Sequence, residues 1–208
     1  MIFAAIGALN STFSALEAVL NGLCENGVQI IVNTGNITLM YNQINKTIAL
    51  LQNHKVACVQ GEFDRIAVQS RRKRGIRSRL STDASEAGAR ARAALNPTAV
   101  EWVRALPRTR RMDMDGIAVM LCHGSPLSLR ETLSRDTTMM RLQRLREAAL
   151  ADIIICGAQA SFSRSAAGAL FVGVGPLAPG DGSLEYTLIS TEEYPWRTEC
   201  HRIPMPSQ

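Results

Sequence analysis

The order of apolar segments in the first third of the chain is the feature that most constrains its fold. Short apolar runs at 2–6, 29–32 and 56–59 have the length of buried strands. Between them lie two stretches, 16–23 and 41–51, whose apolar residues recur at helical spacing. This alternation of strand and helix predicts a largely parallel sheet joined by right-handed crossovers.

The middle of the chain differs in composition and predicts an insert at about residues 70–107. It begins with a basic run that contains Arg71, Arg72, Arg74 and Arg77. An alanine-rich helix is expected over about 84–95. Asn96 and Pro97 then supply an N-cap and a first-turn proline for another helix, which is expected to continue to Leu106. Residues 107–111 are expected to be a connector.

The last hundred residues favour β structure. Asp115-Gly116 is a hairpin signal ahead of an apolar run at 117–122. Further strands are expected at 152–156, 169–172 and 184–189. A helix near Leu145 is expected between the apolar runs at 117–122 and 152–156. The chain shows no repeats and no low-complexity linker. We therefore expect an α/β fold in one domain spanning 1–208, with two sheets between helical layers.

Composition agrees with a globular protein. The chain has 208 residues, 46% of them apolar and 20% charged, which is enough length to bury a core. No apolar run approaches the roughly 20 residues of a membrane span, so no membrane association is expected. The apolar start of the chain lacks a basic flank, so a buried first strand is favoured over a signal peptide.

The cysteines indicate a reducing environment. There are five of them, at scattered positions and without paired spacing: Cys24, Cys58, Cys122, Cys156 and Cys200. An odd number without pairs favours buried free thiols and a cytoplasmic location. The spacing does not fit a zinc site, because no two of these cysteines lie close in sequence.

Five short segments at the ends of predicted strands carry a family resemblance. They are Ala8-Leu9-Asn10, Gly35-Asn36, Gly61-Glu62-Phe63-Asp64, His123-Gly124-Ser125-Pro126 and Gly157-Ala158-Gln159-Ala160. Their order resembles that of the calcineurin-like metallophosphoesterases, and in particular the small bacterial phosphodiesterase branch, over roughly residues 1–190. The resemblance implies a two-sheet αββα sandwich, two bound divalent metals such as manganese, and phosphoester hydrolysis.

The positions that correspond to the family's metal ligands have changed in this chain. The family motifs Asp-x-His, Gly-Asp, Gly-Asn-His-Asp, His-Gly and Gly-His-Thr-His supply seven ligand side chains. The residues at the matching, vestigial positions here are Ala8, Asn10, Asn36, Glu62, His123, Ala158 and Ala160. Only His123 keeps its identity. Phe63 stands where the resemblance places the catalytic histidine.

These changes predict that the chain holds no metal pair. Two dications placed side by side repel each other, and anionic bridging oxygens hold them together. Asn36 cannot supply a negative charge, and the alanines have no ligand atom. We therefore expect no cofactor and no catalytic residues. If one metal still binds, His123 and Glu62 are its expected ligands.

The sequence leaves three functional hypotheses open. The leading one is a pseudoenzyme that keeps the scaffold for binding or assembly. The second is a phosphoesterase with a residual mononuclear site built from His123, Glu62, Asn10 and Asn36. The third is an arginine-driven binder of nucleic acid or another anion through Arg71, Arg72, Arg74 and Arg77, for which a solvated surface loop is the alternative. No partner is identified, and a homo-oligomer and a weak anionic ligand both remain open.

Overall fold

The computed structural model describes residues 1–69 and 82–206. Its first sheet is built from the N-terminal alternation together with the end of the chain. β1 (Ile2–Ile6), β2 (Ile31–Asn33) and β3 (Ala57–Cys58) run parallel, as predicted. The crossovers between them carry α1 (Phe13–Glu25) and α2 (Ile44–Asn53), the latter preceded by short 3₁₀ turns at Ile37–Leu39 and Tyr41–Gln43.

The C-terminal hairpin completes this first sheet. β9 (Ser183–Ser190) pairs antiparallel with β1, and β10 (Arg197–Pro204) pairs antiparallel with β9. The strand order is therefore β10-β9-β1-β2-β3. The two ends of the chain thus share one sheet, and β1 lies at its centre.

The second sheet comes entirely from the second half of the chain. Its order is β4-β5-β6-β8-β7, with bounds β4 Thr109–Met114, β5 Ile117–Cys122, β6 Ile153–Gly157, β7 Phe162–Ala166 and β8 Ala169–Val174. The three central strands are parallel and both edge strands are antiparallel. α6 (Met139–Ala149) crosses from β5 to β6.

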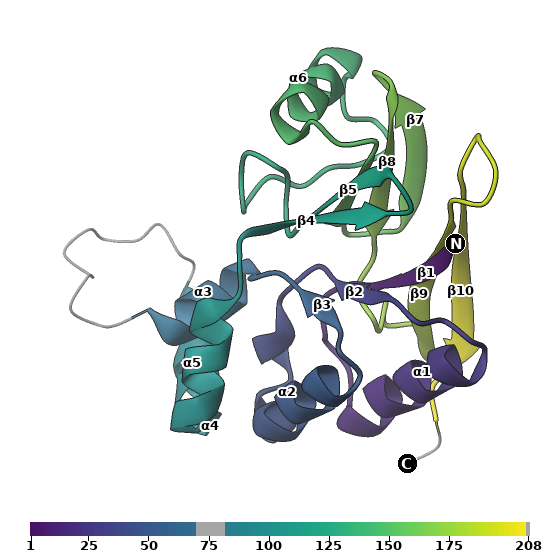
Figure 1. The fold of residues 1–208 in the computed structure, drawn as a ribbon. Coiled ribbons are helices and arrows are strands. Elements are labelled where there is room, and N and C mark those ends of the chain that lie inside the picture. Colours follow the sequence, from purple (N-terminus) through teal and green to yellow (C-terminus); the bar gives the residue numbers. More distant parts are fainter. Residues whose placement is uncertain (70–81, 207–208) are drawn as a thin grey trace.

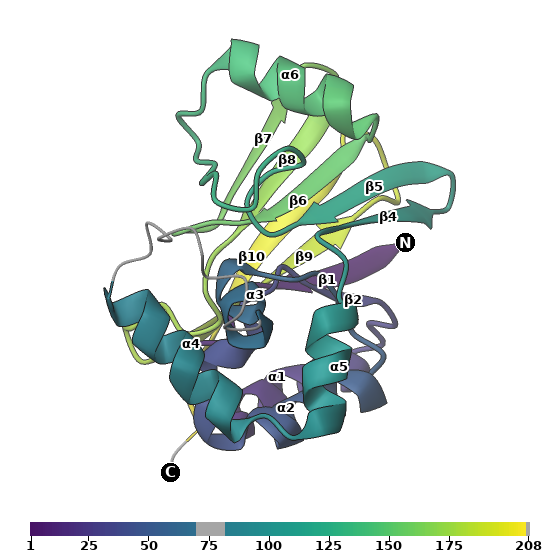
Figure 2. The same cartoon turned by 90° about the vertical axis from the view of Figure 1, so that its left-hand side faces the viewer.

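The two sheets face each other between layers of helices (Figures 1 and 2). α1 and α2 cover the outer face of the first sheet, and α6 covers the outer face of the second. α3 (Glu62–Val68), α4 (Thr82–Ala94) and α5 (Pro97–Ala105) group beside α2. The predicted α/β class and the two-sheet αββα sandwich are confirmed.

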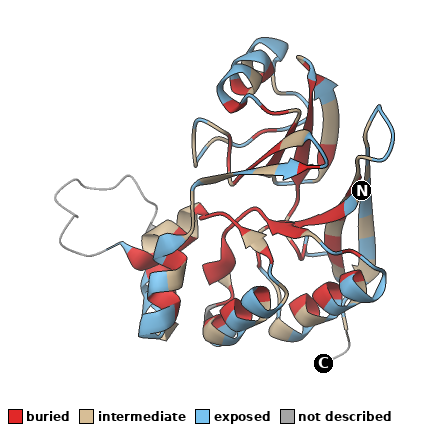
Figure 3. Cartoon of the chain, in the orientation of Figure 1, coloured by how far each residue is buried: buried red, intermediate tan, exposed pale blue. Residues whose placement is uncertain are grey.

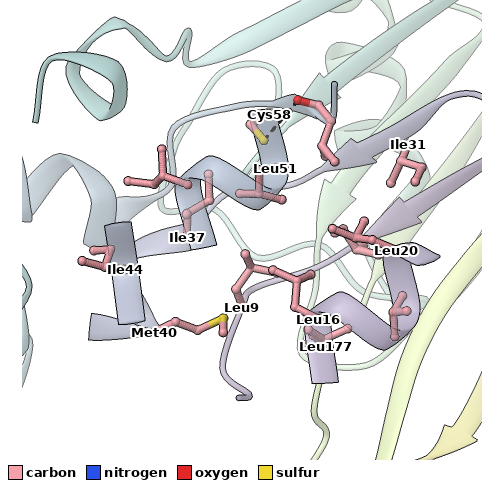
Figure 4. Packing of buried hydrophobic residues seen from close by; sticks show 14 of the residues in the cluster. Leu9, Leu16, Leu20, Ile31, Ile37, Met40, Ile44, Leu51, Cys58 and Leu177 are labelled. Carbon is pink, nitrogen blue, oxygen red and sulfur yellow. Dashed lines mark hydrogen bonds between the residues drawn. The ribbon is translucent and has the colours of Figure 1, made fainter. Parts of the chain in front are cut away.

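Three apolar layers hold these elements together. The layer between the sheets includes Phe3, Val32, Leu121, Ile155 and Val172, which are all fully buried. A second layer joins the first sheet to its helices, including α4 and α5, and Figure 4 shows part of it. A third layer lies beneath α6. Figure 3 accordingly shows that the central strands are buried, that β10 is largely exposed, and that the helices carry both buried and exposed residues.

Several local predictions need correction. Residues 107–111 were expected to be a connector, but β4 begins at Thr109 and pairs with β5. The segment 61–64 was expected only as the end of a strand, but α3 begins within it, at Glu62. All five cysteines are free, as predicted, but Cys24 and Cys200 are exposed. No helix of the described residues is long and apolar enough to cross a membrane.

The two sheets approach each other closely just past the carboxyl end of β1. A Cβ atom added to Gly7 would lie 1.8 Å from the carbonyl oxygen of Gly175, which follows β8. Backbone thus meets backbone at this point, and only a residue without a side chain fits. Gly22, within α1, offers a contrast, because a Cβ atom there would meet nothing within 4 Å.

We predict opposite effects of the same substitution at these two glycines. Gly7→Ala should lower the free energy of unfolding by more than about 2 kcal/mol, because backbone must move to admit the methyl group. Gly22→Ala should raise it by about 0.5–1 kcal/mol, because alanine favours the helix. Urea unfolding of both variants measures this. Equal effects would contradict the close approach of the sheets.

Candidate functional site

A pocket of about 190 Å³ lies where the carboxyl ends of the parallel strands meet. Strand ends of this kind are the usual ligand position in α/β proteins. Its lining contains five of the seven predicted ligand positions, from loops of both sheets: Ala8, Asn36, Glu62, His123 and Ala158. Asn10, Ala160 and Phe63 do not line it. The predicted arginines Arg71, Arg72, Arg74 and Arg77 lie outside the described residues.

His123 links the two sheets at this pocket. Its Nδ1 lies 2.7 Å from the carbonyl oxygen of Thr34, which follows β2. Because a carbonyl only accepts, the ring donates from Nδ1, and the neutral ring keeps its lone pair on Nε2. The backbone N–H of Gly157 donates to the His123 carbonyl at 2.8 Å. His123 therefore has a fixed tautomer and one free ring nitrogen.

Glu62 is paired with Arg130, a residue that lies in none of the five motif segments. Arg130 Nε lies 2.7 Å from Glu62 Oε1, and both residues line the pocket. The Glu62 side chain is 30% exposed and that of Arg130 is 59% exposed, so the pair adds little stability. Its effect is on charge, because the guanidinium neutralises the carboxylate where a metal ion would need it.

Asn36 is held by backbone contacts. It has a left-handed conformation, with φ of 60°. Its side-chain oxygen accepts the N–H of Phe63 at 3.0 Å. One of the two lone pairs of this oxygen is therefore engaged by backbone, and the other end of the amide is an NH₂ group, which only donates. The neighbouring hydroxyl of Thr34 is buried and has no hydrogen-bond partner among the described residues.

Asn10 is turned toward a different loop. Its side-chain NH₂ donates to the Ala178 carbonyl at 2.7 Å, and its side-chain oxygen accepts the Ala178 N–H at 2.9 Å. Both polar ends are thereby satisfied by one residue. Asn10 lines a separate pocket of about 410 Å³ with Phe13 and Met40. Ala160 is exposed. The structure does not bring these two positions together with the other five.

Asp64 holds two of the site's loops in place. Its carboxylate is fully buried and accepts three backbone N–H groups, from Asn36 at 2.8 Å, Thr38 at 2.8 Å and Gly61 at 2.9 Å. Hydrogen bonds to a charged acceptor are stronger than neutral ones. Asp64 therefore fixes the loop after β2 against the start of α3.

A second ionic cluster supports the loop after His123. The Arg141 guanidinium donates to Glu131 at 2.6 and 2.7 Å, and the buried Ser125 hydroxyl also donates to Glu131. The hydrogen bonds from Arg141 lower the pKa of Glu131, with a further contribution from Ser125. This cluster ties the loop to α6, and thus sets the position of Arg130 next to it.

The side chains of the pocket do not fit a pair of metal ions. Within residues 1–69 and 82–206, no group of three or more His, Cys, Asp and Glu side chains is placed to hold a metal. Of the ligand atoms near the pocket, the Asn36 oxygen is bonded to backbone and the Glu62 carboxylate is paired. Among these three side chains of the described chain, His123 is the one whose second ring nitrogen, Nε2, takes no part in the contacts above.

Comparison with known proteins identifies the architecture. No family model and no curated protein sequence matches the chain. A metallophosphoesterase from Sphaerobacter thermophilus superposes with a TM-score of 0.74 at 18% identity, covering 99% of this chain and 90% of that one. The chain has the metallophosphoesterase fold.

Two further structures show the range of proteins with this fold. A hypothetical protein from Pyrococcus horikoshii gives a TM-score of 0.81 at 15% identity, covering 99% of this chain and 88% of its own. Vps29 from Chaetomium thermophilum gives 0.54 at 11% identity, covering 99% and 100%. At these identities the metallophosphoesterase fold is shared, and the chemistry must be argued from the site itself.

We predict that Asp64 is needed for stability. Asp64→Asn keeps the volume but turns one acceptor into a donor that faces backbone N–H groups. It should lower the free energy of unfolding by at least about 3 kcal/mol. The control is Asp136→Ala, an exposed carboxylate, which should change stability by less than about 0.5 kcal/mol. Similar small losses in both would show that the Asp64 hydrogen bonds are not needed.

The Glu131–Arg141 pair should make stability depend on pH. The pKa of Glu131 is lower in the folded protein than in the unfolded chain. The pair therefore stabilises the fold fully at pH values above the unfolded-state pKa of Glu131. This stabilisation is lost as the pH falls through the folded-state pKa. Arg141→Gln should cost about 1–3 kcal/mol at neutral pH, and progressively less below about pH 4. Arg144→Gln, exposed on the same helix, is the control. A loss that does not change with pH would contradict this account.

Proposed function

We propose that this protein is a catalytically inactive relative of the metallophosphoesterases whose scaffold serves binding or assembly. The observation that carries the proposal is the Glu62–Arg130 ion pair at 2.7 Å. Glu62 is the one carboxylate among the seven positions, and it is bound to a guanidinium. The charge that two metals would supply is replaced in part by a side chain.

The hydrogen bonds of the remaining positions support the same conclusion. Asn36 gives its oxygen to Phe63, and Asn10 gives both amide ends to Ala178. Hydrolysis in this fold needs a metal-activated water, and a pair of metals needs anionic bridging ligands. Neither requirement is met by a single histidine and a neutralised glutamate.

A mononuclear phosphoesterase is the second candidate, and one observation favours it. The bond to Thr34 leaves the Nε2 lone pair of His123 free, which is the form that binds metals. A cation would have to displace Arg130 from Glu62. The arginine-driven anion binder is the third candidate. Its support within the described chain is Arg130 at the pocket, because the predicted arginines Arg71, Arg72, Arg74 and Arg77 lie outside it.

The test compares metal binding and turnover in the wild type and in Arg130→Ala. The wild-type protein should not hydrolyse bis-p-nitrophenyl phosphate with Mn²⁺ present. Arg130→Ala frees Glu62 and should tighten Mn²⁺ binding, measured by calorimetry, by about tenfold, which corresponds to ~1.4 kcal/mol. The matched control is Arg104→Ala, which removes an arginine from a surface ion pair with Glu101 on α5.

Two results would overturn the proposal. One is wild-type turnover that disappears in His123→Ala, which would establish a working site. The other is tight Mn²⁺ binding by the wild type that Arg130→Ala leaves unchanged. In that case Arg130 would not compete with a cation.

A further inference from the structure

A thiol and an imidazole meet on the opposite side of the first sheet from the α6 layer, at the ends of α1 and α2. Cys24 Sγ lies 3.4 Å from His54 Nδ1. Cys24 is exposed and His54 is half-buried. Neither residue lines the pocket at the strand ends. The pair is therefore independent of the proposed function.

The backbone holds both partners in place. His54 caps α2, and its N–H donates to the Leu50 carbonyl at 3.0 Å. Lys55 follows in a left-handed conformation, with φ of 53°, which closes the helix end. Cys24 lies in the last turn of α1, and its carbonyl accepts the N–H of Gly27 at 3.0 Å. Sulfur and nitrogen thus face each other from two helix ends whose backbone is hydrogen-bonded.

The other four cysteines are poorly suited to react. Burial raises the pKa of Cys58 and Cys122, and raises that of Cys156 to about 12. The pKa of Cys200 is raised by partial burial and by the neighbouring Glu185. The thiolate is the reactive form of cysteine, so these shifts suppress reactivity. Among the five, only Cys24 combines exposure with a hydrogen bond to histidine.

We propose that Cys24 and His54 form a reactive thiol site that undergoes exchange with small-molecule disulfides. In this step Cys24 Sγ attacks one sulfur of the disulfide, and its proton passes to His54 Nδ1. The disulfide bond breaks and the second sulfur leaves as a thiolate, which takes up the proton as a thiol. The product is a mixed disulfide on Cys24, and no other oxidant is needed.

The experiment measures which cysteine of the folded chain reacts with 5,5′-dithiobis(2-nitrobenzoate), and how fast. Peptide mapping by mass spectrometry assigns the modified residue. Cys24 should be modified first, and its rate should fall about tenfold in His54→Gln, which keeps a polar side chain but has no base. Cys24→Ser should abolish the fast phase. Cys200→Ser, the matched exposed cysteine, should leave that phase unchanged.

A second reagent separates base catalysis from simple charge attraction. 4,4′-Dithiodipyridine is uncharged, whereas the first reagent is a dianion. If the rate of Cys24 modification falls equally with both reagents in His54→Gln, the result supports proton transfer to His54. A loss with the dianion alone overturns the proposal, as does a fast phase that survives Cys24→Ser or an unchanged rate in His54→Gln.

Discussion

The apolar layer between the two sheets is the constraint on which the site depends. Phe3 and Val32 on one sheet pack in the same cluster as Leu121 and Ile155 on the other. This packing brings the carboxyl ends of both sets of parallel strands to one edge of the sandwich. The loops that follow those strands then have to share a small space, and Gly7 meets Gly175 there. The pocket is a consequence of this geometry.

Hydrogen bonds and ion pairs hold the loops around the pocket. Asp64 fixes the loop after β2 through backbone N–H groups, and Glu131 with Arg141 fixes the loop after β5. The bond from His123 to Thr34 joins the two sheets directly. Each contact satisfies a polar group within the protein. These contacts hold the loops in place although few metal-ligating side chains are present. Among the described residues of these loops, the buried hydroxyls of Thr34 and Thr38 have no hydrogen-bond partner.

Much of the fold could be predicted from the sequence because its signals are local. The alternation of apolar runs and helical spacing placed β1, β2, β3 and the intervening helices to within a few residues. The hairpin signal Asp115-Gly116 also marked a real turn, with φ of 55° and 82°. The strands that were missed, β4, β7 and β10, are edge strands. Their residues are partly exposed and carry charges, so they lack the continuous apolar run of a central strand.

The candidate site was predictable in position but not in its contacts. The family resemblance implied that Asn36, Glu62 and His123 share one site, and all three line the same pocket in the structure. Arg130 could not be identified, because it lies in an irregular loop and its approach to Glu62 depends on how that loop folds. The orientation of Asn10 toward Ala178 is likewise set by a loop distant in sequence. Such contacts leave no local pattern.

The proposed function requires that this pocket does not assemble two metal ions. The most direct measurement is anomalous scattering from crystals of the wild-type protein soaked in Mn²⁺. The account predicts no paired peaks beside His123, because Arg130 holds Glu62 and the Asn36 oxygen is bonded to Phe63. Two strong peaks at that position, within bridging distance of each other, would contradict it.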